Sequence, residues 1–184
     1  MAEHVCPWWI GYLLLSPLRR LYQNPQKMLA PYIEAGAIVL DVGCAMGFFS
    51  LDMARMVGAE GKVVCVDLQP KMIKALVRRA TKAGLNDRID HRVCDKNGLG
   101  LEGLDGKIDF ALAFALVHEL PDAEAFFEQI HAALRPGGTC LVAEPKGHVS
   151  EKRFEETLAA AEKNGLELGE RPQIGRSHAA LVSR

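Results

Sequence analysis

The chain has 184 residues, enough for one domain with a substantial core, and 49% of them are hydrophobic and 24% charged. These fractions exclude a disordered tail and a bundle of membrane spans. The 22 basic and 23 acidic residues give a net charge of −1. Proteins that bind nucleic acid through its phosphates normally carry a basic excess, so we expect no nucleic-acid partner.

The five cysteines are widely spaced and odd in number, and no CxxC pair occurs. A disulfide framework is therefore not expected. Four of the cysteines fall in or beside apolar runs, where a free cysteine packs as a small hydrophobe. This usage favours a reducing, cytoplasmic compartment.

An apolar run at residues 7–15 follows Glu3 and precedes Arg19 and Arg20. A secretion signal has its positive charge before the apolar run, and this run is too short to span a bilayer. We expect neither a signal peptide nor a stable membrane anchor. The two arginines are interpreted as a solvated face, with binding of an anionic substrate as the less favoured alternative.

Short apolar runs alternate with helix-period segments along the chain. The runs predict strands at residues 37–41, 62–67, 89–94, 108–113 and 139–143, and the segments between them predict helices at 48–57, 70–83, 122–134 and 150–163. Glycines at 58, 84 and 137–138 mark helix ends, and Pro70 and Pro121 mark helix starts. Such alternation is typical of βαβ units and a parallel sheet.

The two ends of the chain depart from this alternation. Residues 166–170 and 178–182 predict two strands with no room for a helix between them, hence an antiparallel hairpin. Helical pieces at 12–22 and 25–33 precede the first strand. We expect a single α/β domain over residues 1–184, with a helical cap at 1–35 and a core at 36–184. The core is predicted to be a doubly wound, mostly parallel sheet with helices on both faces.

The first predicted strand leads into the turn Asp41-Val42-Gly43-Cys44-Ala45-Met46-Gly47. Open α/β sheets bind ligands beyond the carboxyl ends of their strands, and glycines let the backbone approach a ligand closely. The spacing lacks the Gly-x-Gly-x-x-Gly that a dinucleotide pyrophosphate usually requires. A tight packing turn remains the alternative interpretation of the glycines alone.

Two further acidic residues favour a ligand-binding turn over a packing turn. Asp67 ends the second strand, 20 residues after Gly47, where a carboxylate can accept both hydroxyls of a ribose. Asp95 follows the third strand, positioned to meet an adenine amino group. Each acid could instead cap the segment after it. Acids after three neighbouring strands fit a nucleoside cradle better than three independent caps.

At these residues the chain resembles the class I S-adenosylmethionine-dependent methyltransferases. The resemblance rests, in family order, on VLDVGCAMGFFS (39–50), VVCVDLQPKMI (63–73), VCD (93–95), DFALAFALVHELPD (109–122) and LRPGGTCLVAEP (134–145). It is closest to small-molecule methyltransferases of the ubiquinone and menaquinone biosynthesis type and their arsenite-methylating relatives, although the cysteine arrangement of the arsenite enzymes is absent. The fold it implies is Rossmann-like, and the tail LELGE…SHAALVS fits the family's terminal hairpin.

The resemblance also implies the cofactor, S-adenosylmethionine, with S-adenosylhomocysteine as product, and a small-molecule acceptor. The resemblance implies that Asp41, Gly43 and Gly47 line the methionine moiety, with Cys44 in the same turn, and that Asp67 binds the ribose. It implies that Leu68 and Met72 flank the adenine, and that Asp95 meets the adenine amino group with Cys94 beside it. Ala113 and Phe114 are implied near the reactive methyl. Ala45 stands where many relatives have glycine. Phe114 stands where many have a polar residue, which favours an apolar or aromatic-lined channel.

Methyl transfer from a sulfonium is an in-line displacement in which alignment and desolvation supply much of the acceleration. A base is needed only when the acceptor arrives protonated. His118, after the fourth strand, is a candidate base, and Glu144 and His148, after the fifth, could orient a hydroxyl or receive a proton. Loop residues that merely pack or face solvent are the alternative. The three could also form a two-histidine, one-carboxylate metal site, but we predict no metal.

The segment containing His4, Cys6, Trp8 and Trp9, with Tyr12, could form an aromatic wall over the cofactor for a flat or cationic acceptor. A hydrophobic staple for the cap is the alternative. Taken together, the residues predict a methyltransferase acting on a small molecule. A non-catalytic cofactor-binding module and a nicotinamide-dependent oxidoreductase remain alternatives, and neither the acceptor atom nor the oligomeric state is predicted.

Overall fold

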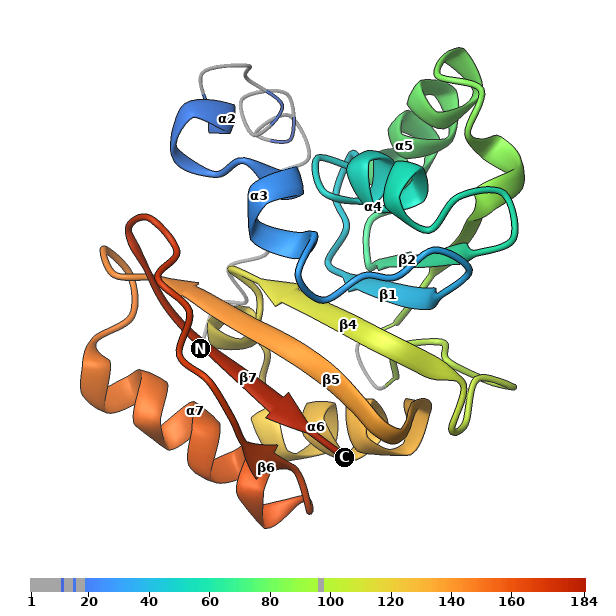
Figure 1. Cartoon of the computed structure of the whole chain (residues 1–184). Coiled ribbons are helices and arrows are strands. Elements are labelled where there is room, and N and C mark those ends of the chain that lie inside the picture. Colours follow the sequence, from blue (N-terminus) through green and yellow to red (C-terminus); the bar gives the residue numbers. More distant parts are fainter. Residues whose placement is uncertain (1–10, 12–14, 16–18, 96–97) are drawn as a thin grey trace. The chain divides into compact units, whose positions relative to one another are not determined.

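The computed structural model describes residues 11, 15, 19–95 and 98–184. The chain divides into two compact units, Ala2–Gly100 and Leu101–Arg184. In Figure 1 the first is coloured blue to green and the second yellow-green to red. The described residues contain seven strands, three in the N-terminal unit and four in the C-terminal unit.

The N-terminal unit contains three parallel strands in the order β3-β2-β1. Their bounds are Ile38–Val42 for β1, Lys62–Asp67 for β2 and Ile89–Val93 for β3. Almost every side chain of β1 and β2 is buried, as their continuous apolar runs predict. Because the two strands are parallel and Asp41 is paired with Cys65, the acids at their carboxyl ends lie at the same edge.

The helices of this unit are α2 (Arg19–Tyr22), α3 (Pro25–Leu29), α4 (Ser50–Met56) and α5 (Pro70–Lys82), with a 3-10 turn, η1, at Asn86–Arg88. Pro70 begins α5, where its missing N–H has no cost. Gly58 and Gly84, with φ of 72° and 66°, follow the ends of α4 and α5. Figure 1 shows α4 and α5 on the same side of β1 and β2.

The C-terminal unit contains four strands in the order β4-β5-β7-β6. They are β4 (Ile108–Phe114), β5 (Leu134–Pro145), β6 (Glu167–Leu168) and β7 (Ser177–Ser183). β4 and β5 are parallel, whereas β7 runs antiparallel to both β5 and β6. The prediction of a mostly parallel α/β fold that ends in an antiparallel hairpin is therefore confirmed.

Two helices, α6 (Ala123–Ala133) and α7 (Glu151–Lys163), and the 3-10 turn η2 (Val117–Glu119) complete this unit. Asp122 caps α6 by accepting a 3.0 Å hydrogen bond from the N–H of Ala125. Ser150 caps α7 in the same way through the N–H of Arg153, at 3.3 Å. Figure 1 shows α6 and α7 on the same side of β5 and β7.

Several boundaries differ from the predicted ones. β5 starts at Leu134 rather than 139, because residues 135–138 bulge out between the pairs Ile108–Leu134 and Phe110–Thr139. A Cβ on Gly138 would lie 2.8 Å from the carbonyl oxygen of Ile108, so this bulge requires glycine. α3 ends at Leu29 rather than 33, and β6 is only Glu167–Leu168. Of the helix predicted at 12–22, the described residues are helical at Arg19–Tyr22 (α2) but form a turn at Leu15.

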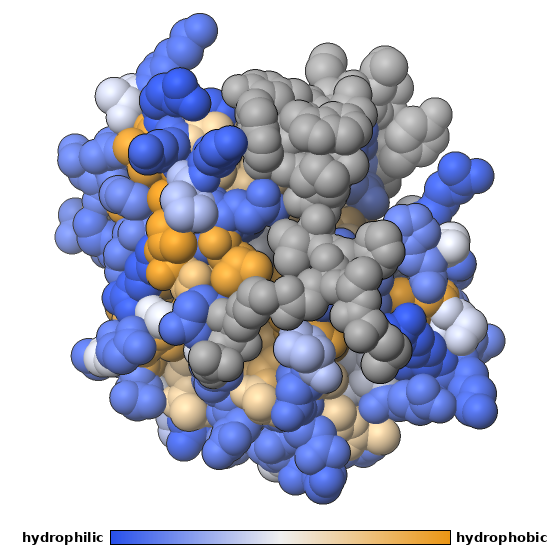
Figure 2. All heavy atoms as spheres, turned by 180° about the vertical axis from the view of Figure 1, so that it is seen from behind, coloured by the Kyte–Doolittle hydropathy of each residue, from blue (hydrophilic) through white to orange (hydrophobic). Residues whose placement is uncertain are grey.

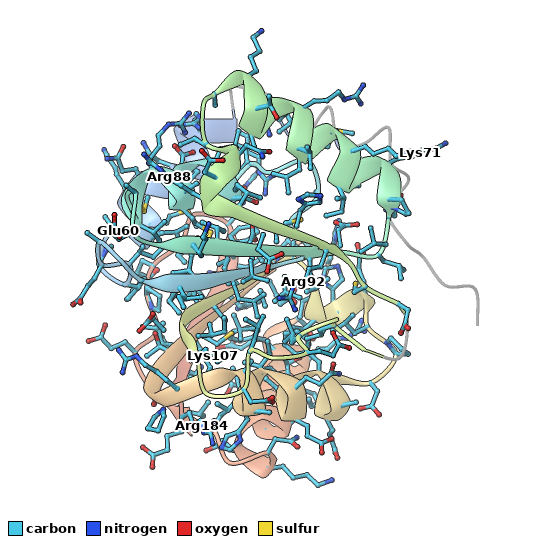
Figure 3. The ribbon with its side chains drawn as sticks, turned by 90° about the vertical axis from the view of Figure 1, so that its right-hand side faces the viewer. Glu60, Lys71, Arg88, Arg92, Lys107 and Arg184 are labelled. Carbon is cyan, nitrogen blue, oxygen red and sulfur yellow. The ribbon has the colours of Figure 1, made fainter. Side chains whose placement is uncertain are left out.

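Hydrophilic side chains cover most of the described surface on the face that Figure 2 shows. Lys71, for example, points outward from the start of α5 (Figure 3). Val93 and Leu168 are the large hydrophobic residues that are exposed within the described ranges. None of the helices in those ranges is both long and apolar enough to cross a bilayer. The single domain and its cap at 1–35 stay predictions.

Candidate functional site

The turn after β1 is fastened to the end of β2. The N–H groups of Gly43 and Cys44 both donate to the carbonyl oxygen of Val66, at 2.9 and 3.0 Å. Gly43 and Gly47 have φ of 69° and 78°, which only glycine adopts freely. A Cβ on Gly47 would also lie 2.3 Å from Cδ1 of Leu76 in α5. The backbone therefore favours glycine at both positions, and the close approach of α5 requires it at Gly47.

Asp67, at the end of β2, holds the same turn through its side chain. Its Oδ2 accepts a 2.9 Å hydrogen bond from the N–H of Ala45, and its Oδ1 a 2.8 Å bond from the N–H of Gln69. Burial raises the pKa of this carboxyl, and the two amide hydrogen bonds lower it. Ala45, where many relatives have glycine, takes φ of 48°, so the residue retains the backbone shape that glycine would give.

Asp41 is buried at the end of β1, only 2% exposed. The hydroxyl of Ser50, at the start of α4, donates to its Oδ2 at 2.5 Å. Burial raises the pKa of Asp41 to about 7, while the hydrogen bond from Ser50 and the positive charge of Arg19 lower it. This carboxyl therefore changes its charge near neutral pH.

Arg19, interpreted from the sequence as part of a solvated face, is half-buried in the structure. Its guanidinium lies 4.2 Å above the centre of the Phe48 ring, and its Nε donates to Gln23 at 2.6 Å. Burial lowers its pKa to about 10, and the nearby charge of Asp41 opposes that shift. The solvated-face interpretation is therefore wrong for Arg19.

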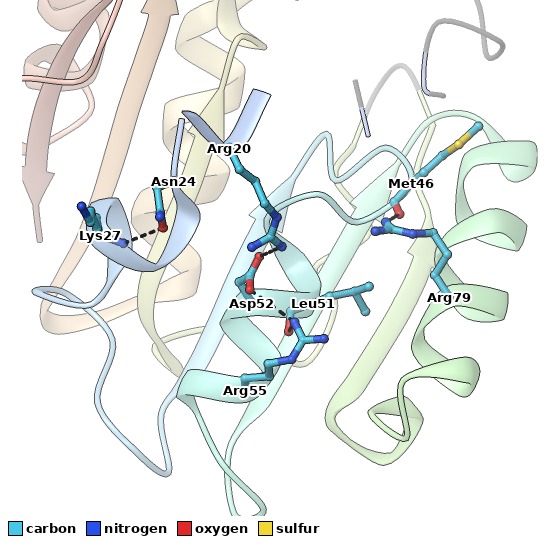
Figure 4. A network of polar contacts seen from close by, with 8 residues as sticks. All are labelled: Arg20, Asn24, Lys27, Met46, Leu51, Asp52, Arg55 and Arg79. Atoms are coloured by element: carbon cyan, nitrogen blue, oxygen red, sulfur yellow. Dashed lines mark hydrogen bonds and ion pairs between the residues drawn. The ribbon is translucent and has the colours of Figure 1, made fainter. Parts of the chain in front are cut away.

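The neighbouring Arg20 behaves as a surface residue. It is half-exposed and forms a 2.6 Å ion pair with Asp52, whose other oxygen lies 3.3 Å from Arg55. Figure 4 shows this network together with the hydrogen bond from Arg79 to the carbonyl oxygen of Met46. The two consecutive arginines thus have different environments, and only Arg19 lies close to Asp41.

The residues predicted at the adenine form two groups. Met72 is buried in an apolar cluster with Met46 and Ala75, against which Ala45 packs. A Cβ on Gly11 would lie 2.9 Å from the Met72 sulfur, so Gly11 lies directly against this methionine. Met72 therefore serves packing in this structure. Leu68, four residues earlier in the chain, is half-buried.

The second group follows β3. The N–H of Cys94 donates to the carbonyl oxygen of Asp67 at 3.1 Å. Burial raises the pKa of its thiol to about 11, which keeps it protonated at neutral pH. Asp95 is exposed, and its Oδ1 accepts a 3.0 Å hydrogen bond from the N–H of Gly98. Asp95 therefore caps the segment that follows it through one of its carboxylate oxygens, as the capping alternative predicts.

In the C-terminal unit, Ala113 is buried and Phe114 half-buried at the end of β4. Ala115 follows with φ of 53°, and its N–H donates to the carbonyl oxygen of Ala143 at 2.7 Å. A non-glycine residue with positive φ directly after a strand costs energy, and such residues cluster at functional sites. The backbone then enters η2, which carries His118.

Glu144 joins β5 to η2. It is 0% exposed, its Oε1 accepts hydrogen bonds from the N–H groups of Val117 at 2.7 Å and His118 at 3.3 Å, and its Oε2 lies 2.5 Å from Nδ1 of His118. His148 is exposed, and its ring centre lies 6.0 Å from that of His118. The structure thus brings the three predicted catalytic candidates together. Within the described ranges, no group of three or more potential ligands is arranged to hold a metal ion.

The four described cysteines at positions 44, 65, 94 and 140 are free thiols. The predicted wall of His4, Cys6, Trp8, Trp9 and Tyr12 lies outside the described residues. Sequence reasoning did not anticipate the packing of Arg19 on Phe48, the hydrogen bond from Ser50 to Asp41 or the backbone partners of Glu144. The position of Ser50 near the start of the predicted helix at 48–57, directly after the glycine turn, was the signal from which its contact with Asp41 could have been predicted.

Comparison with known proteins gives relatives over most of the chain. A methyltransferase domain family matches residues 33–173. The ubiquinone biosynthesis O-methyltransferase of Xanthomonas euvesicatoria pv. vesicatoria (strain 85-10) is 32% identical over 132 residues, which are 71% of this chain and 53% of that protein. The protein of the same name from Xanthomonas campestris pv. campestris (strain B100) is 33% identical over 140 residues, 73% of this chain and 54% of that protein. The chain spans about half the length of these curated relatives.

Solved structures show the same fold. A SAM-dependent methyltransferase from Aquifex aeolicus is similar with a TM-score of 0.85 at 24% identity, covering 97% of this chain and 100% of that chain. A putative S-adenosyl-L-methionine-dependent methyltransferase from Methanococcus maripaludis has a TM-score of 0.80 at 16% identity, covering 100% and 97%. These likenesses confirm the Rossmann-like α/β fold. Because the family match covers most of the sequence as well, the chain belongs to the methyltransferase domain family.

Proposed function

We propose that the protein transfers a methyl group from S-adenosylmethionine to a small-molecule acceptor and releases S-adenosylhomocysteine. The observation that carries this proposal is the buried Asp67, which holds the glycine turn after β1 from the end of β2. The names of the curated relatives, ubiquinone biosynthesis O-methyltransferases, support a small-molecule acceptor.

Asp67 fits the ribose of such a cofactor. An ionised carboxylate has about four acceptor positions on its two oxygens. The N–H groups of Ala45 and Gln69 each use one, on different oxygens. One position on each oxygen is then available for a ribose hydroxyl. The carboxylate can therefore order the turn and bind the sugar at the same time.

Arg19 and Asp41 fit the methionine moiety, which carries one carboxylate and one ammonium group. The two side chains have opposite charges and lie close enough to shift each other's pKa. We place the cofactor carboxylate at Arg19 and its ammonium at Asp41, with Gly43, Cys44 and Gly47 lining the turn. Stacking on Phe48 holds the guanidinium in place before any ligand binds.

For the adenine, Leu68 and the segment Cys94–Asp95 are our proposed contacts, with Met72 supporting them from the apolar cluster. Ala113 and Phe114, at the end of β4, stay our proposal for the neighbourhood of the reactive methyl. The bound cofactor supplies an electrophilic methyl group on a sulfonium. The chain's own contribution is then to align the acceptor, to exclude water and to handle a proton where the acceptor carries one. We propose the cytoplasm as the compartment, which the free cysteines support.

Isothermal titration with S-adenosylhomocysteine tests the proposal, with NADH as the comparison ligand. We expect saturable binding of the first ligand alone. Asp67→Ala should weaken that binding at least tenfold, about 1.4 kcal/mol, whereas the exposed Glu60→Ala should leave it unchanged. Binding of NADH instead would support the oxidoreductase alternative. Tight binding without turnover against a broad acceptor panel would support the non-catalytic module.

A further inference from the structure

The pair formed by His118 and Glu144 has a geometry that assigns separate roles to its two members. Glu144 is fully buried near the end of β5, where it is paired with His178 of β7. Both contacts to its Oε1 come from backbone N–H groups, of Val117 and His118. The carboxylate is thus an acceptor fixed on three sides, out of reach of any bound acceptor molecule.

This arrangement determines which nitrogen of His118 carries a proton. Because Oε2 accepts, Nδ1 of His118 donates to it across the 2.5 Å contact. In the neutral imidazole, Nε2 is then the hydrogen-bond acceptor. A buried carboxylate that orients a histidine in this way also stabilises the imidazolium that forms when Nε2 takes up a proton.

The surroundings of His118 hold the ring while leaving it reachable. Its side chain is 14% exposed. Arg153 of α7 donates to the carbonyl oxygen of His118 at 3.2 Å, and this contact fixes η2 from a second element. Two further titratable side chains lie close to His118: His148, whose ring centre is 6.0 Å away, and Arg153 at the carbonyl oxygen. Glu144 is the charged group that contacts the imidazole ring itself.

We propose that Nε2 of His118 is the general base for an acceptor hydroxyl and that Glu144 is its positioning residue, so that the protein methylates oxygen. The inference rests on the proposed methyl transfer. As the hydroxyl oxygen bonds to the methyl carbon, the carbon–sulfur bond breaks and its electron pair returns to sulfur, giving S-adenosylhomocysteine. The hydroxyl proton passes to Nε2 of His118 and then to water.

The chemistry of the possible acceptors explains why such a base points to oxygen. A phenol or enol keeps its proton at neutral pH, so a base raises the nucleophilicity of its oxygen. A neutral amine attacks through a free lone pair and loses its proton afterwards, and an aromatic thiol is already largely ionised. A fixed, neutral imidazole therefore benefits a hydroxylated aromatic or enolic acceptor most.

Two variants separate catalysis from structure. His118→Gln removes the base. Glu144→Gln keeps an oxygen for the two backbone N–H groups, but its amide NH2 faces Nδ1 of His118 and donates to it, which moves the ring proton to Nε2. The second variant thus preserves the packing and inverts the tautomer. The exposed His91→Gln, in β3, is the matched control.

The acceptors assayed are catechol, 4-nitrophenol, thiophenol and aniline in mildly alkaline buffer, where 4-nitrophenol and thiophenol are mainly ionised. We expect the wild type to methylate catechol, and both variants to lose about 10²-fold or more in kcat/KM for it. Transfer to 4-nitrophenol should fall far less, because that oxygen needs no base. His91→Gln should match the wild type. Equal losses for both phenols, or no loss for catechol, would overturn the inference.

A spectroscopic measurement requires no acceptor. In ¹⁵N NMR of histidine-labelled protein, His118 should be the Nδ1-protonated tautomer, and Glu144→Gln should convert it to the Nε2-protonated one. A wild-type ring protonated on Nε2 contradicts the proposal, whatever the acceptor panel shows. Transfer to thiophenol or aniline alone also overturns it but leaves methyl transfer standing. Absent binding of S-adenosylhomocysteine would instead remove the proposed function itself.

Discussion

The backbone N–H of Ala45 donates a 2.9 Å hydrogen bond to Oδ2 of Asp67, which ties the turn after β1 to the end of β2. To make this hydrogen bond, Ala45 adopts a left-handed backbone conformation, with φ of 48°. The conformation of the turn and the position of the proposed ribose ligand Asp67 are therefore coupled, so a substitution in the turn can affect both stability and cofactor binding.

Replacing Ala45 by glycine should raise the free energy of unfolding by about 1 kcal/mol, because glycine adopts positive φ without strain. The hydrogen bond to Asp67 uses the backbone and is kept, so affinity for S-adenosylhomocysteine should not fall. Urea denaturation and titration measure the two effects. Ala159→Gly, on the exposed side of α7, should instead lose about 1 kcal/mol. An equal loss in both variants would show that Ala45 is unstrained.

The stability of the protein should depend on pH through Asp41. Its pKa is about 7 in the folded protein and about 3.9 in an unfolded chain. Between these values the folded state holds a proton that the unfolded state has released, so stability falls as pH rises from about 4 to about 7. Asp41→Asn, measured by urea denaturation across this range, should flatten the decline. A slope that is unchanged in the variant would contradict the assignment.

Gly47 and Gly58 provide a matched pair, because both have φ above 70° but only one is crowded. At Gly58 a Cβ would meet nothing within 4 Å, so Gly58→Ala should cost about 1 kcal/mol of backbone strain. At Gly47 the Cβ would lie 2.3 Å from Cδ1 of Leu76. Gly47→Ala should therefore cost a further 1–3 kcal/mol or so from overpacking.

The crowding at Gly47 has its own control. Combining Gly47→Ala with Leu76→Val removes the crowded methyl group, and the double variant should lose less stability than the sum of the two single variants. Strict additivity in thermal or urea denaturation would show that Leu76 is not what excludes a side chain at this position.

Arg19 should discriminate between ligands with and without the amino acid group. Arg19→Gln is expected to weaken binding of S-adenosylhomocysteine about tenfold, the effect of losing one charge-assisted contact. Binding of 5′-methylthioadenosine, which lacks the amino acid, should not change. Arg55→Gln, which removes a surface ion pair with Asp52, is the control. Equal weakening of both ligands would place Arg19 in the structural support of the turn.

Much of the fold could be predicted from the sequence, because the patterns that specify its strands and helix ends are local. The apolar runs that became β1 and β2 are buried on both faces, and Gly58 and Gly84 stop helices where they were expected to. The early start of β5 has a nonlocal cause. β5 starts early because residues 135–138 bulge against β4, and that register depends on a partner strand.

The candidate site divides in the same way. The order of strands and helices, the glycine turn and the acids after the strands could all be predicted, because each is encoded by residues next to one another. The burial of Glu144 against His118, 26 residues away, and the stacking of Arg19 on Phe48 beside Asp41 became visible only in the packed chain. Those contacts join residues distant in the chain, and the free energy of desolvation and hydrogen bonding that selects them exists only once the elements have packed.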